Sequence, residues 1–296
     1  MIRLLTCPAA FEVLAGALVF GVGGFVAETA GLSQQSMAGV AALMQIGAVM
    51  ITVLPLIAVK RADFAYYARL NPFPLRSIPF VLVAAVYTAL LSAVLNFLAA
   101  YAIGGPVGGL ELTFSQMGAM EITAYIVLPA LCEELLLRGA VLRDLEGCGG
   151  GAILLCGLAF AMLHGDIHNF AGPLAAGMIY AWLTLVLDSV WPAIFCHLAN
   201  NMLAAVLPEI MPAVTVHPVI LWVSVAVALL VMTYILISLF ETDYGISYSA
   251  SDGTSPGGRF ERTILTVFSL PAILFVMFFV YNALGMTFIR DFIMSL

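Results

Sequence analysis

Charged residues are scarce in this 296-residue chain. Lysine and arginine together number ten, aspartate and glutamate number 17, and the four types make up only 9% of the sequence. Soluble globular proteins carry roughly 25% charged residues, whereas hydrophobic residues fill 63% of this chain. A water-soluble fold has no way to bury that much apolar surface, so the composition excludes a soluble domain and makes the lipid bilayer the solvent.

The chain also lacks a charged tail and paired cysteines. Its net charge of -7 is spread thinly over the loops, and the absence of a basic segment argues against nucleic acid as a partner. The five cysteines form no Cys-x-x-Cys pair and lie mostly in apolar stretches. We therefore interpret them as small buried apolar residues rather than as a disulfide framework or a metal site.

Apolar stretches of about 20 residues, the length that spans a bilayer, recur along the whole chain. They predict an all-α, polytopic transmembrane helix bundle of about eight to nine spanning helices. We expect a single membrane domain over residues 1–296 and detect no second domain or internal repeat. The predicted helices occupy residues 9–28, 36–59, 77–103, 116–145, 150–165, 170–188, 191–207, 216–240 and 264–287.

The basic residues are distributed unevenly between the predicted loops. If all nine segments span, Arg290 alone falls on one side, Arg138 lies within a helix, and the other eight basic residues fall on the opposite side. The positive-inside rule then places the N-terminus on the cytoplasmic side, and we expect the membrane to be the plasma (inner) membrane. The polar stretch at 241–262 becomes a cytoplasmic loop. The eight basic residues of that side are Arg3, Lys60, Arg61, Arg69, Arg76, Arg143, Arg259 and Arg262.

The densest group of ionisable residues inside an apolar segment is Glu133-Glu134 followed by Arg138. Each such group costs at least ~2.5 kcal/mol to insert, so it needs an explanation. Arg138 lies one helical turn after Glu134 and can pair with it, which would hold one carboxylate ionised and leave Glu133 free for acid/base chemistry. The simpler alternative is that these residues mark a helix end that reaches water.

The four histidines all lie between positions 164 and 217. Two of them stand one helical turn from a notable residue: His164 follows Phe160, and Asn201 follows His197. A lone histidine in a membrane helix is more often a hydrogen-bonding group between helices than a catalyst. With a hairpin turn near Cys148, however, Glu133 and His164 reach matching depths on antiparallel helices.

The predicted depths bring these groups together. Glu133 should lie ~7 Å deeper than Arg138, and His197 ~12 Å from the end of its helix. We therefore expect Glu133, His164 and His197 to meet in the inner half of the membrane, in an aqueous cavity open to the cytoplasmic leaflet. A bundle without water could not supply the reactant for hydrolysis.

Two carboxylates, two imidazoles and an amide in a low-dielectric cavity are suited to hydrolysis. A glutamate, alone or with His164, can take a proton from water, while His197 and Asn201 can donate hydrogen bonds to a developing oxyanion. Glu134, His164 and His197 could instead hold a zinc ion, which would acidify its bound water. The sequence leaves both chemistries open.

These motifs resemble the CPBP family of intramembrane proteases, which includes CAAX prenyl proteases and bacteriocin-processing enzymes. Glu133-Glu134-x-x-x-Arg138-Gly139 is similar to the first motif of the family, Phe160-x-x-x-His164 to the second and His197-x-x-x-Asn201 to the third. The three occur in the family's order within residues 131–201, which we take as the catalytic core.

The resemblance implies hydrolysis of a peptide bond in a membrane-associated or lipidated peptide or protein. Glu133, Glu134 and His164 would activate water, His197 and Asn201 would complete the site, and Arg138 and Phe160 would support it. Zn2+ is a possible cofactor, because family members are described as metalloproteases, although a metal-independent glutamate mechanism is also argued.

Two other functions stay open for the same sequence. A proton- or ion-coupled transporter could use the intramembrane glutamates and histidines as an ion path, and it would show paired broken helices and an internal repeat. A non-catalytic bacteriocin-immunity or scaffold protein could keep the protease architecture.

The loop expected at Gly165-Asp166-Ile167-His168-Asn169 lies near the predicted cavity mouth, where Asp166 could orient an imidazole.

Overall fold

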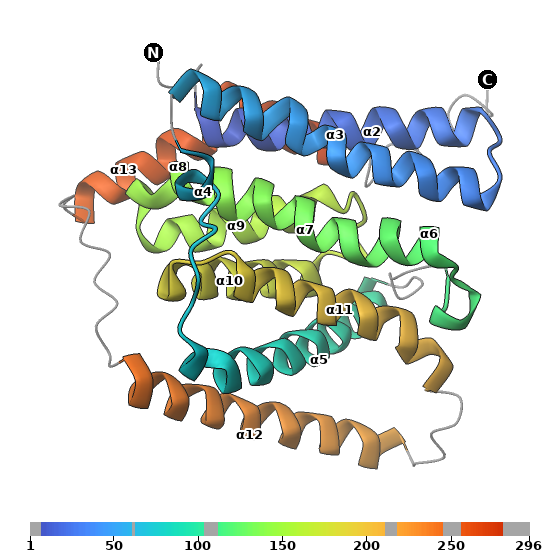
Figure 1. Cartoon of the computed structure of the whole chain (residues 1–296). Helices are drawn as coiled ribbons and strands as arrows, with labels where there is room; N and C mark the ends of the chain where they lie inside the picture. Colours follow the sequence, from blue (N-terminus) through green and yellow to red (C-terminus); the bar gives the residue numbers. More distant parts are fainter. Residues whose placement is uncertain (1–6, 61–62, 104–111, 211–217, 245–255, 281–296) are drawn as a thin grey trace.

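The computed structural model describes residues 7–60, 63–103, 112–210, 218–244 and 256–280. Within these ranges the chain is helical and contains no strand, and its long helices lie side by side in an up-and-down bundle (Figure 1). The predicted all-α polytopic bundle is confirmed.

The elements follow the predicted order along the chain. The first part contains α2 (Pro8–Thr29), α3 (Gln34–Lys60), α4 (Phe64–Tyr67), η1 (Leu75–Ser77), α5 (Ile78–Ile103) and η2 (Phe114–Gln116). The central part contains α6 (Ala119–Ile122), η3 (Thr123–Val127), α7 (Leu128–Glu134), η4 (Leu135–Val141), α8 (Leu142–Leu145), η5 (Glu146–Cys148), α9 (Gly150–Leu163) and α10 (Ala171–Leu187). The last part contains α11 (Trp191–Ile210), α12 (Pro218–Tyr244), α13 (Pro256–Val267) and α14 (Leu270–Val280).

Fewer helices than predicted reach the length and apolarity of a membrane span. Among the described residues four do, or up to five if the bent pair α13 and α14 forms one span. α9 and α10 are apolar but have only 14 and 17 residues, short of the ~20 that cross a bilayer. α13 also begins at Pro256, inside the stretch predicted to be a polar loop as far as residue 262.

The run from Ala119 to Leu145 is helical throughout but changes its winding twice. The π-helical turns η3 and η4 lie on either side of α7, which carries both glutamates. A π turn shifts the hydrogen-bond register and frees backbone groups, and such turns recur at functional sites. The π-helical turn η4 therefore contains Arg138 and Gly139 of the first motif and directly follows its two glutamates.

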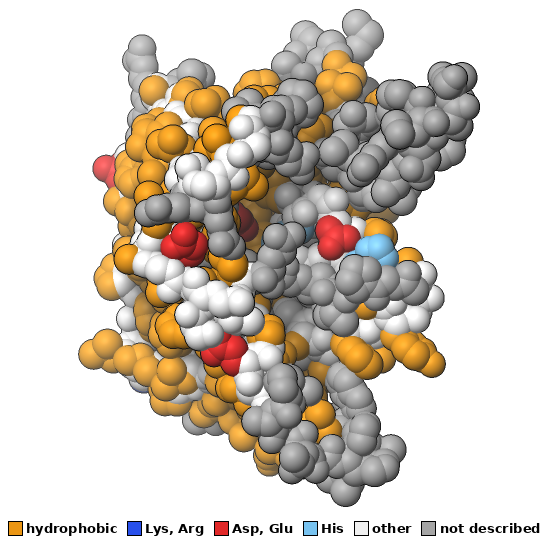
Figure 2. Space-filling view, turned by 90° about the vertical axis from the view of Figure 1, so that its right-hand side faces the viewer, with side chains coloured by type: hydrophobic (Ala, Val, Ile, Leu, Met, Phe, Trp, Pro, Cys, Tyr) orange, Lys and Arg blue, Asp and Glu red, His pale blue; other side chains and the backbone are white. Residues whose placement is uncertain are grey.

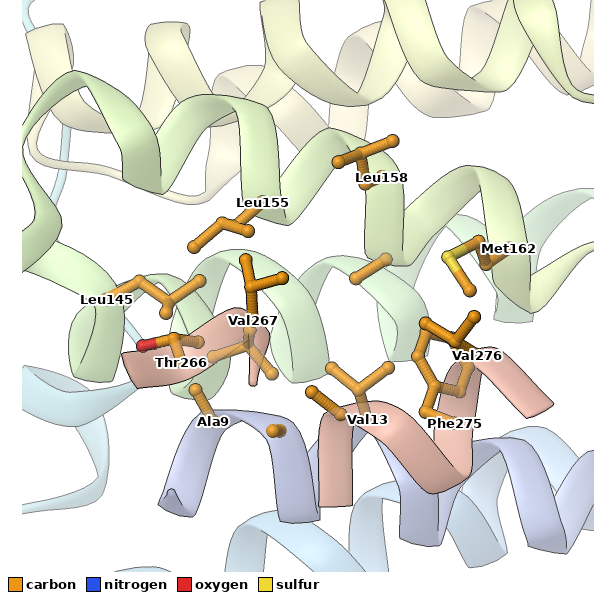
Figure 3. A pocket seen from close by; sticks show the side chains of 14 residues that line it. Ala9, Val13, Leu145, Leu155, Leu158, Met162, Thr266, Val267, Phe275 and Val276 are labelled. Atoms are coloured by element: carbon orange, nitrogen blue, oxygen red, sulfur yellow. The ribbon is translucent and has the colours of Figure 1, made fainter. Parts of the chain in front are cut away.

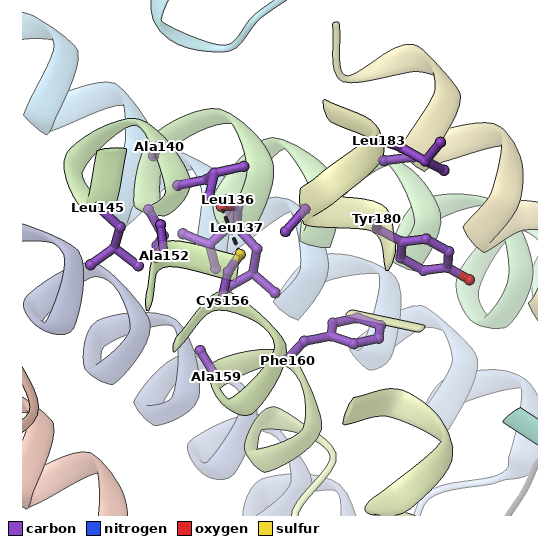
Figure 4. Packing of buried hydrophobic residues seen from close by; sticks show 14 of the residues in the cluster. Leu136, Leu137, Ala140, Leu145, Ala152, Cys156, Ala159, Phe160, Tyr180 and Leu183 are labelled. Carbon is purple, nitrogen blue, oxygen red and sulfur yellow. Dashed lines mark hydrogen bonds between the residues drawn. The ribbon is translucent and has the colours of Figure 1, made fainter. Parts of the chain in front are cut away.

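Small residues let the central helices approach closely. A Cβ atom at Gly177 on α10 would lie 3.0 Å from the Cα atom of Gly157 on α9 and 3.0 Å from Cδ1 of Phe160. Small residues at helix crossings are the usual solution in membranes, where packing rather than hydrophobicity holds helices together. The buried cluster around this crossing includes Leu136, Leu137, Cys156 and Phe160, with the Cys156 thiol 3.4 Å from the carbonyl of Leu137 (Figure 4).

A buried arginine ties the loops together at the end of the bundle that carries the basic loops. Arg69, which is 2% exposed, forms ion pairs with Asp188, at 2.9 Å, and with Glu146. Its carbonyl accepts a hydrogen bond from the backbone of Val190 at 2.9 Å. Burial lowers the pKa of Arg69, and the two carboxylates oppose that shift. The contacts hold the α10–α11 turn against the end of α8.

A small apolar cavity of about 140 Å³ lies between α2, α9 and the α13–α14 pair. Val13, Leu155, Met162 and Phe275 point into it, and Thr266 is its one polar lining residue (Figure 3). With so few polar partners it offers no site for water or for chemistry.

The Gly157–Gly177 crossing can be tested by adding volume. Gly177→Val should lower the free energy of unfolding by about 1–3 kcal/mol, because the added methyl groups meet backbone and ring atoms. Gly39→Val, on α3, is the matched control, because a Cβ there meets no atom within 4 Å. Thermal unfolding in detergent, followed with a thiol-reactive dye on buried Cys148, Cys156 and Cys196, should show a lower Tm for Gly177→Val alone. Equal Tm values for the two variants would contradict the close crossing.

Candidate active site

A fully buried ion pair forms the base of the site. The Glu134 and Arg138 side chains are both 0% exposed, and Arg138 Nη1 donates to Glu134 Oε1 at 2.9 Å. Nη2 of Arg138 donates to the carbonyl of Gly177 on α10 at 2.9 Å. The pairing predicted from the one-turn spacing is confirmed. The guanidinium cannot lose its charge, so the Glu134 carboxylate faces a permanent cation.

The same glutamate oxygen holds His197. His197, on α11, is 2% exposed, and its Nδ1 lies 2.9 Å from Glu134 Oε1. An ionised carboxylate can only accept, so Nδ1 carries the proton that points to Glu134 and Nε2 is left for another partner. Glu134 therefore fixes both the tautomer and the orientation of the imidazole.

Aromatic rings surround the two histidines. The Phe160 ring meets His164 edge to face with centroids 4.9 Å apart and His197 in the same way at 5.2 Å. The Arg138 guanidinium lies 4.7 Å from the centroid of Phe160 and 5.3 Å from that of Tyr180, and Tyr180 stacks on His197 at 5.7 Å. Of the predicted supporting residues, Phe160 contacts both histidines, and Arg138 contacts Glu134, the carboxylate that holds His197.

His164 stands at the C-terminal end of α9, where its side chain is exposed. Its Nδ1 lies 2.9 Å from the carbonyl oxygen of Phe160. A carbonyl only accepts, so Nδ1 donates and the Nε2 lone pair is free to accept a proton. His164 therefore has the tautomer that a general base needs.

The two adjacent glutamates have different surroundings. Glu133 lines a large cavity and is half-buried, whereas Glu134 lies behind His197, out of the cavity. Gln45, on α3, donates from Nε2 to Glu133 Oε1 at 3.1 Å. The pairing of Glu134 with Arg138 agrees with the predicted division of the two carboxylates, and the role of Glu133 in acid/base chemistry stays a prediction.

Asn201 also faces the cavity, together with its neighbour Asn200. Nδ2 of Asn201 donates to the carbonyl of Ile126 at 3.3 Å, and Ile126 belongs to the π turn η3. That bond orients the amide, which has a second N–H to offer. Asn200 has the same access to the cavity, although the motif spacing pointed to Asn201 alone.

The cavity has a volume of about 730 Å³, within the range of small-molecule and peptide pockets. Its polar lining residues come from α3, α5, α7, α11 and the end of α9 with the loop that follows it, and apolar residues of α5, α11 and α12 form much of the rest. Four of the five predicted catalytic residues line the cavity, and Glu134 supports one of them. Its polar lining comprises Gln45, Ser92, Asn96, Glu133, His164, Asn169, His197, Asn200 and Asn201.

The predicted zinc ligands do not come together as a ligand set. Glu134 Oε1 already accepts from both Arg138 and His197. Among the residues that the structure describes, no group of three or more His, Cys, Asp or Glu side chains is placed to hold a metal ion. A catalytic zinc site needs three protein ligands around an open position. The described residues therefore do not form a site that fits the metal.

The cavity lies further from the basic loops than the sequence predicted. Its lining on α3 comes from Ala41 and Gln45, near the start of that helix, and on α11 from residues as late as Pro208, near its end. Both positions belong to the end of the bundle opposite α8 and α13 (Figure 1). Figure 2 looks onto that end and shows a hollow with acidic and histidine side chains beside it.

The fold and the site define a polytopic helical protein that carries a carboxylate, histidine and amide cavity inside its bundle. Residues 113–203 match the family model described as Rce1-like, type II CAAX prenyl endopeptidase Rce1-like. The match spans all five predicted catalytic residues and confirms the resemblance to the CPBP and CAAX protease family. It indicates a protease, and the apolar helices indicate an integral membrane protein. The chain matches no curated protein and no solved structure at a significant level.

Sequence reasoning missed three residues that shape the site: Gln45, Asn96 and Tyr180. Asn96 Oδ1 accepts from the backbone of Gly172 at 2.8 Å, and its Nδ2 donates to Asn169 at 2.7 Å, so it fastens the α9–α10 loop beside the cavity. Gln45 and Asn96 are isolated polar residues in apolar helices, and the cost of burying an amide in a membrane was the signal that could have flagged them. Tyr180 gave no such signal.

Removing one partner of the buried ion pair should cost more than removing both. Arg138→Met leaves the Glu134 carboxylate buried without its cation, which typically costs 3–5 kcal/mol. Adding Glu134→Gln to Arg138→Met removes the uncompensated charge and should recover part of the lost Tm in a thermal unfolding assay. Arg76→Met, at an exposed arginine, is the control and should leave the Tm unchanged. A double variant no more stable than Arg138→Met would refute the pairing.

Proposed function

We propose that this protein is an intramembrane endopeptidase of the CAAX-protease type that hydrolyses a peptide bond of a membrane-associated or lipidated substrate without a resident metal. The observation that supports it most strongly is the separation of roles between Glu133 and Glu134. Glu133 faces the cavity with Gln45 as its one hydrogen-bond donor among the described residues, while Glu134 holds an imidazole from behind.

The proposed reaction begins with water in the cavity between Glu133 and His164. Glu133 takes one proton from the water as its oxygen attacks the scissile carbonyl carbon, and His164 Nε2 accepts a hydrogen bond from the second proton. The carbonyl π electrons move onto oxygen, so a tetrahedral intermediate with one negative oxygen forms. General base catalysis of this kind contributes ~100- to 10,000-fold to a rate.

His197 and Asn201 are proposed to stabilise that oxygen. His197, held at Nδ1 by Glu134, is proposed to take a second proton from solvent at Nε2 before the substrate binds and to donate it in a hydrogen bond to that oxygen, and the second N–H of Asn201 donates beside it. Collapse of the intermediate breaks the C–N bond, and Glu133 returns its proton to the leaving nitrogen. The remaining water proton, which is hydrogen-bonded to His164, passes through this imidazole to the released amine. The products are a carboxylate and an ammonium group, and Glu133 has given up the proton that it took.

The apolar wall between α5, α11 and α12 is suited to the hydrophobic portion of the substrate. Leu90, Val94, Leu207 and Val225 line it, and burial of an alkyl chain there contributes roughly 0.8 kcal/mol per CH₂ group. A prenyl group, as processed by the matched family, is one chain of this kind. The transporter alternative lacks support from bent helices, because the one bent pair among the described residues, α13 and α14, contributes nothing to the cavity lining.

Cleavage of a quenched fluorescent lipidated peptide by the detergent-purified protein tests this function. Glu133→Gln and His164→Ala should each lower kcat by ~100-fold or more, since each removes a group that handles the water proton. Glu241→Gln, at an exposed glutamate on the last turns of α12, is the matched control and should retain activity. Activity that survives in Glu133→Gln would point to a contaminant, and activity lost to a zinc chelator and restored by zinc would refute the metal-free mechanism.

Gln45 should act as a positioning residue for Glu133. Gln45→Leu removes the hydrogen bond to a charged group, which is worth ~1.5–3 kcal/mol, so kcat should fall about tenfold or more while KM changes little. Gln116→Leu makes the same chemical change in an exposed turn outside the cavity and should leave both constants intact. A rise in KM with unchanged kcat would assign Gln45 to substrate binding instead.

A further inference from the structure

One amide side chain in the cavity lining differs from the others in its hydrogen bonding. Asn200 lines the cavity but has no hydrogen-bond partner among the residues that the structure describes. Its helix, α11, is long and apolar enough to cross a membrane, and an unbonded amide is costly in such surroundings. A partner for Asn200 therefore has to come from what the cavity holds. The other four lining amides, Gln45, Asn96, Asn169 and Asn201, are all bonded within the protein.

Asn200 lies beside His197 on α11, on the side that Asn201 leaves open. It follows His197 by three residues, which is a rise of ~4.5 Å and a rotation of about 300° on an α-helix. Asn201, one residue later, is rotated by a further 100° or so and reaches the carbonyl of Ile126 in η3. The two amides are thus turned to opposite sides of His197, by about 60° and about 40°.

An apolar stripe continues from Asn200 along the same face of α11. Leu203 and Leu207, three and seven residues further on, also line the cavity, and this spacing keeps side chains on one face of a helix. The face is therefore polar at His197 and Asn200 and apolar beyond them. A peptide with its scissile carbonyl at His197 and a neighbouring side chain on the leucines has to bring a peptide group past Asn200.

The amide of an asparagine is chemically matched to a peptide group. The side chain offers N–H donors and an acceptor oxygen, and a peptide group offers one donor and one acceptor. A polar group that is buried without a partner loses roughly 1–3 kcal/mol. A contact between Asn200 and a peptide group of the substrate removes that loss on both sides.

We infer that Asn200 binds the main chain of the substrate, at a peptide group adjacent to the scissile bond. This inference rests on the proposed function. The contact reads no side chain, because every residue except proline carries the same N–H and C=O groups. It is made before the transition state as well as in it, so its loss raises KM and leaves kcat unchanged.

Asn200→Ala in the full-length, detergent-purified protein tests the role of this side chain. KM for the quenched fluorescent lipidated peptide should rise about fivefold or more, with kcat within about twofold, as expected for one lost hydrogen bond. Asn201→Ala, at the neighbouring amide, should instead lower kcat. The Tm of Asn200→Ala should not fall, since no hydrogen bond within the described structure is lost and alanine favours a helix. A lower kcat with unchanged KM, or a lower Tm, would overturn the binding role.

The peptide group that Asn200 contacts is identified by changing the substrate. Ester analogues, in which one peptide N–H is replaced by oxygen, remove one donor and weaken one acceptor without altering a side chain. They are made in turn on either side of the scissile bond. One analogue should raise KM about fivefold or more for the unsubstituted protein but less than about twofold for Asn200→Ala, because both changes remove the same bond. Equal effects on the two proteins at every position would contradict a main-chain contact.

The order of the assays separates this inference from the proposed function. Cleavage of the parent peptide that is lost in Glu133→Gln upholds the protease, whatever Asn200→Ala then shows. Binding of a singly labelled form of the peptide to Glu133→Gln, measured by fluorescence anisotropy, should weaken about fivefold when Asn200→Ala is added. An unchanged Kd would overturn this inference alone, and no cleavage of the parent peptide by the unsubstituted protein would refute both.

Discussion

The buried contact between Glu134 and Arg138 is the interaction on which the rest of the site depends. Its carboxylate oxygen serves two donors, Arg138 within its own helix and His197 from α11. Arg138 in turn reaches the carbonyl of Gly177 on α10. Breaking such a pair would leave a charge without compensation in a dry interior, which costs far more than the net gain of forming it. The pair therefore fixes the relative position of three helices more than it adds stability.

Close packing makes this contact possible. The Arg138 side chain reaches the carbonyl of Gly177 where Gly157 and Gly177 let α9 and α10 pack closely together. The Phe160 ring covers the guanidinium of Arg138. A weakly hydrated, planar cation tolerates an aromatic face better than an ammonium does. The glycines, the ring and the ion pair therefore form one unit, in which the loss of any member displaces His197.

The sequence predicted the local part of this unit and the meeting of Glu133, His164 and His197 at one cavity, but it missed other contacts between distant residues. The one-turn spacings of Glu134 and Arg138 and of Phe160 and His164 follow from helix geometry, and both appear in the structure. Gln45 lies 88 residues before Glu133, so no spacing rule connects them. The cavity lining extends further from the basic loops than predicted. Counting residues from charged loops says which groups share a level, but not on which side of that level the helices separate.

The division between the two glutamates explains why the motif needs both. A carboxylate that must accept a proton from water has to be accessible and lightly bonded, as Glu133 is with one donor from Gln45. A carboxylate that holds a histidine has to be shielded from water and paired with a cation, as Glu134 is with Arg138. Adjacent positions on a helix point about 100° apart, so a single turn can present one group to the cavity and the other to the core. Two residues in sequence thereby combine opposite environments within a few ångströms.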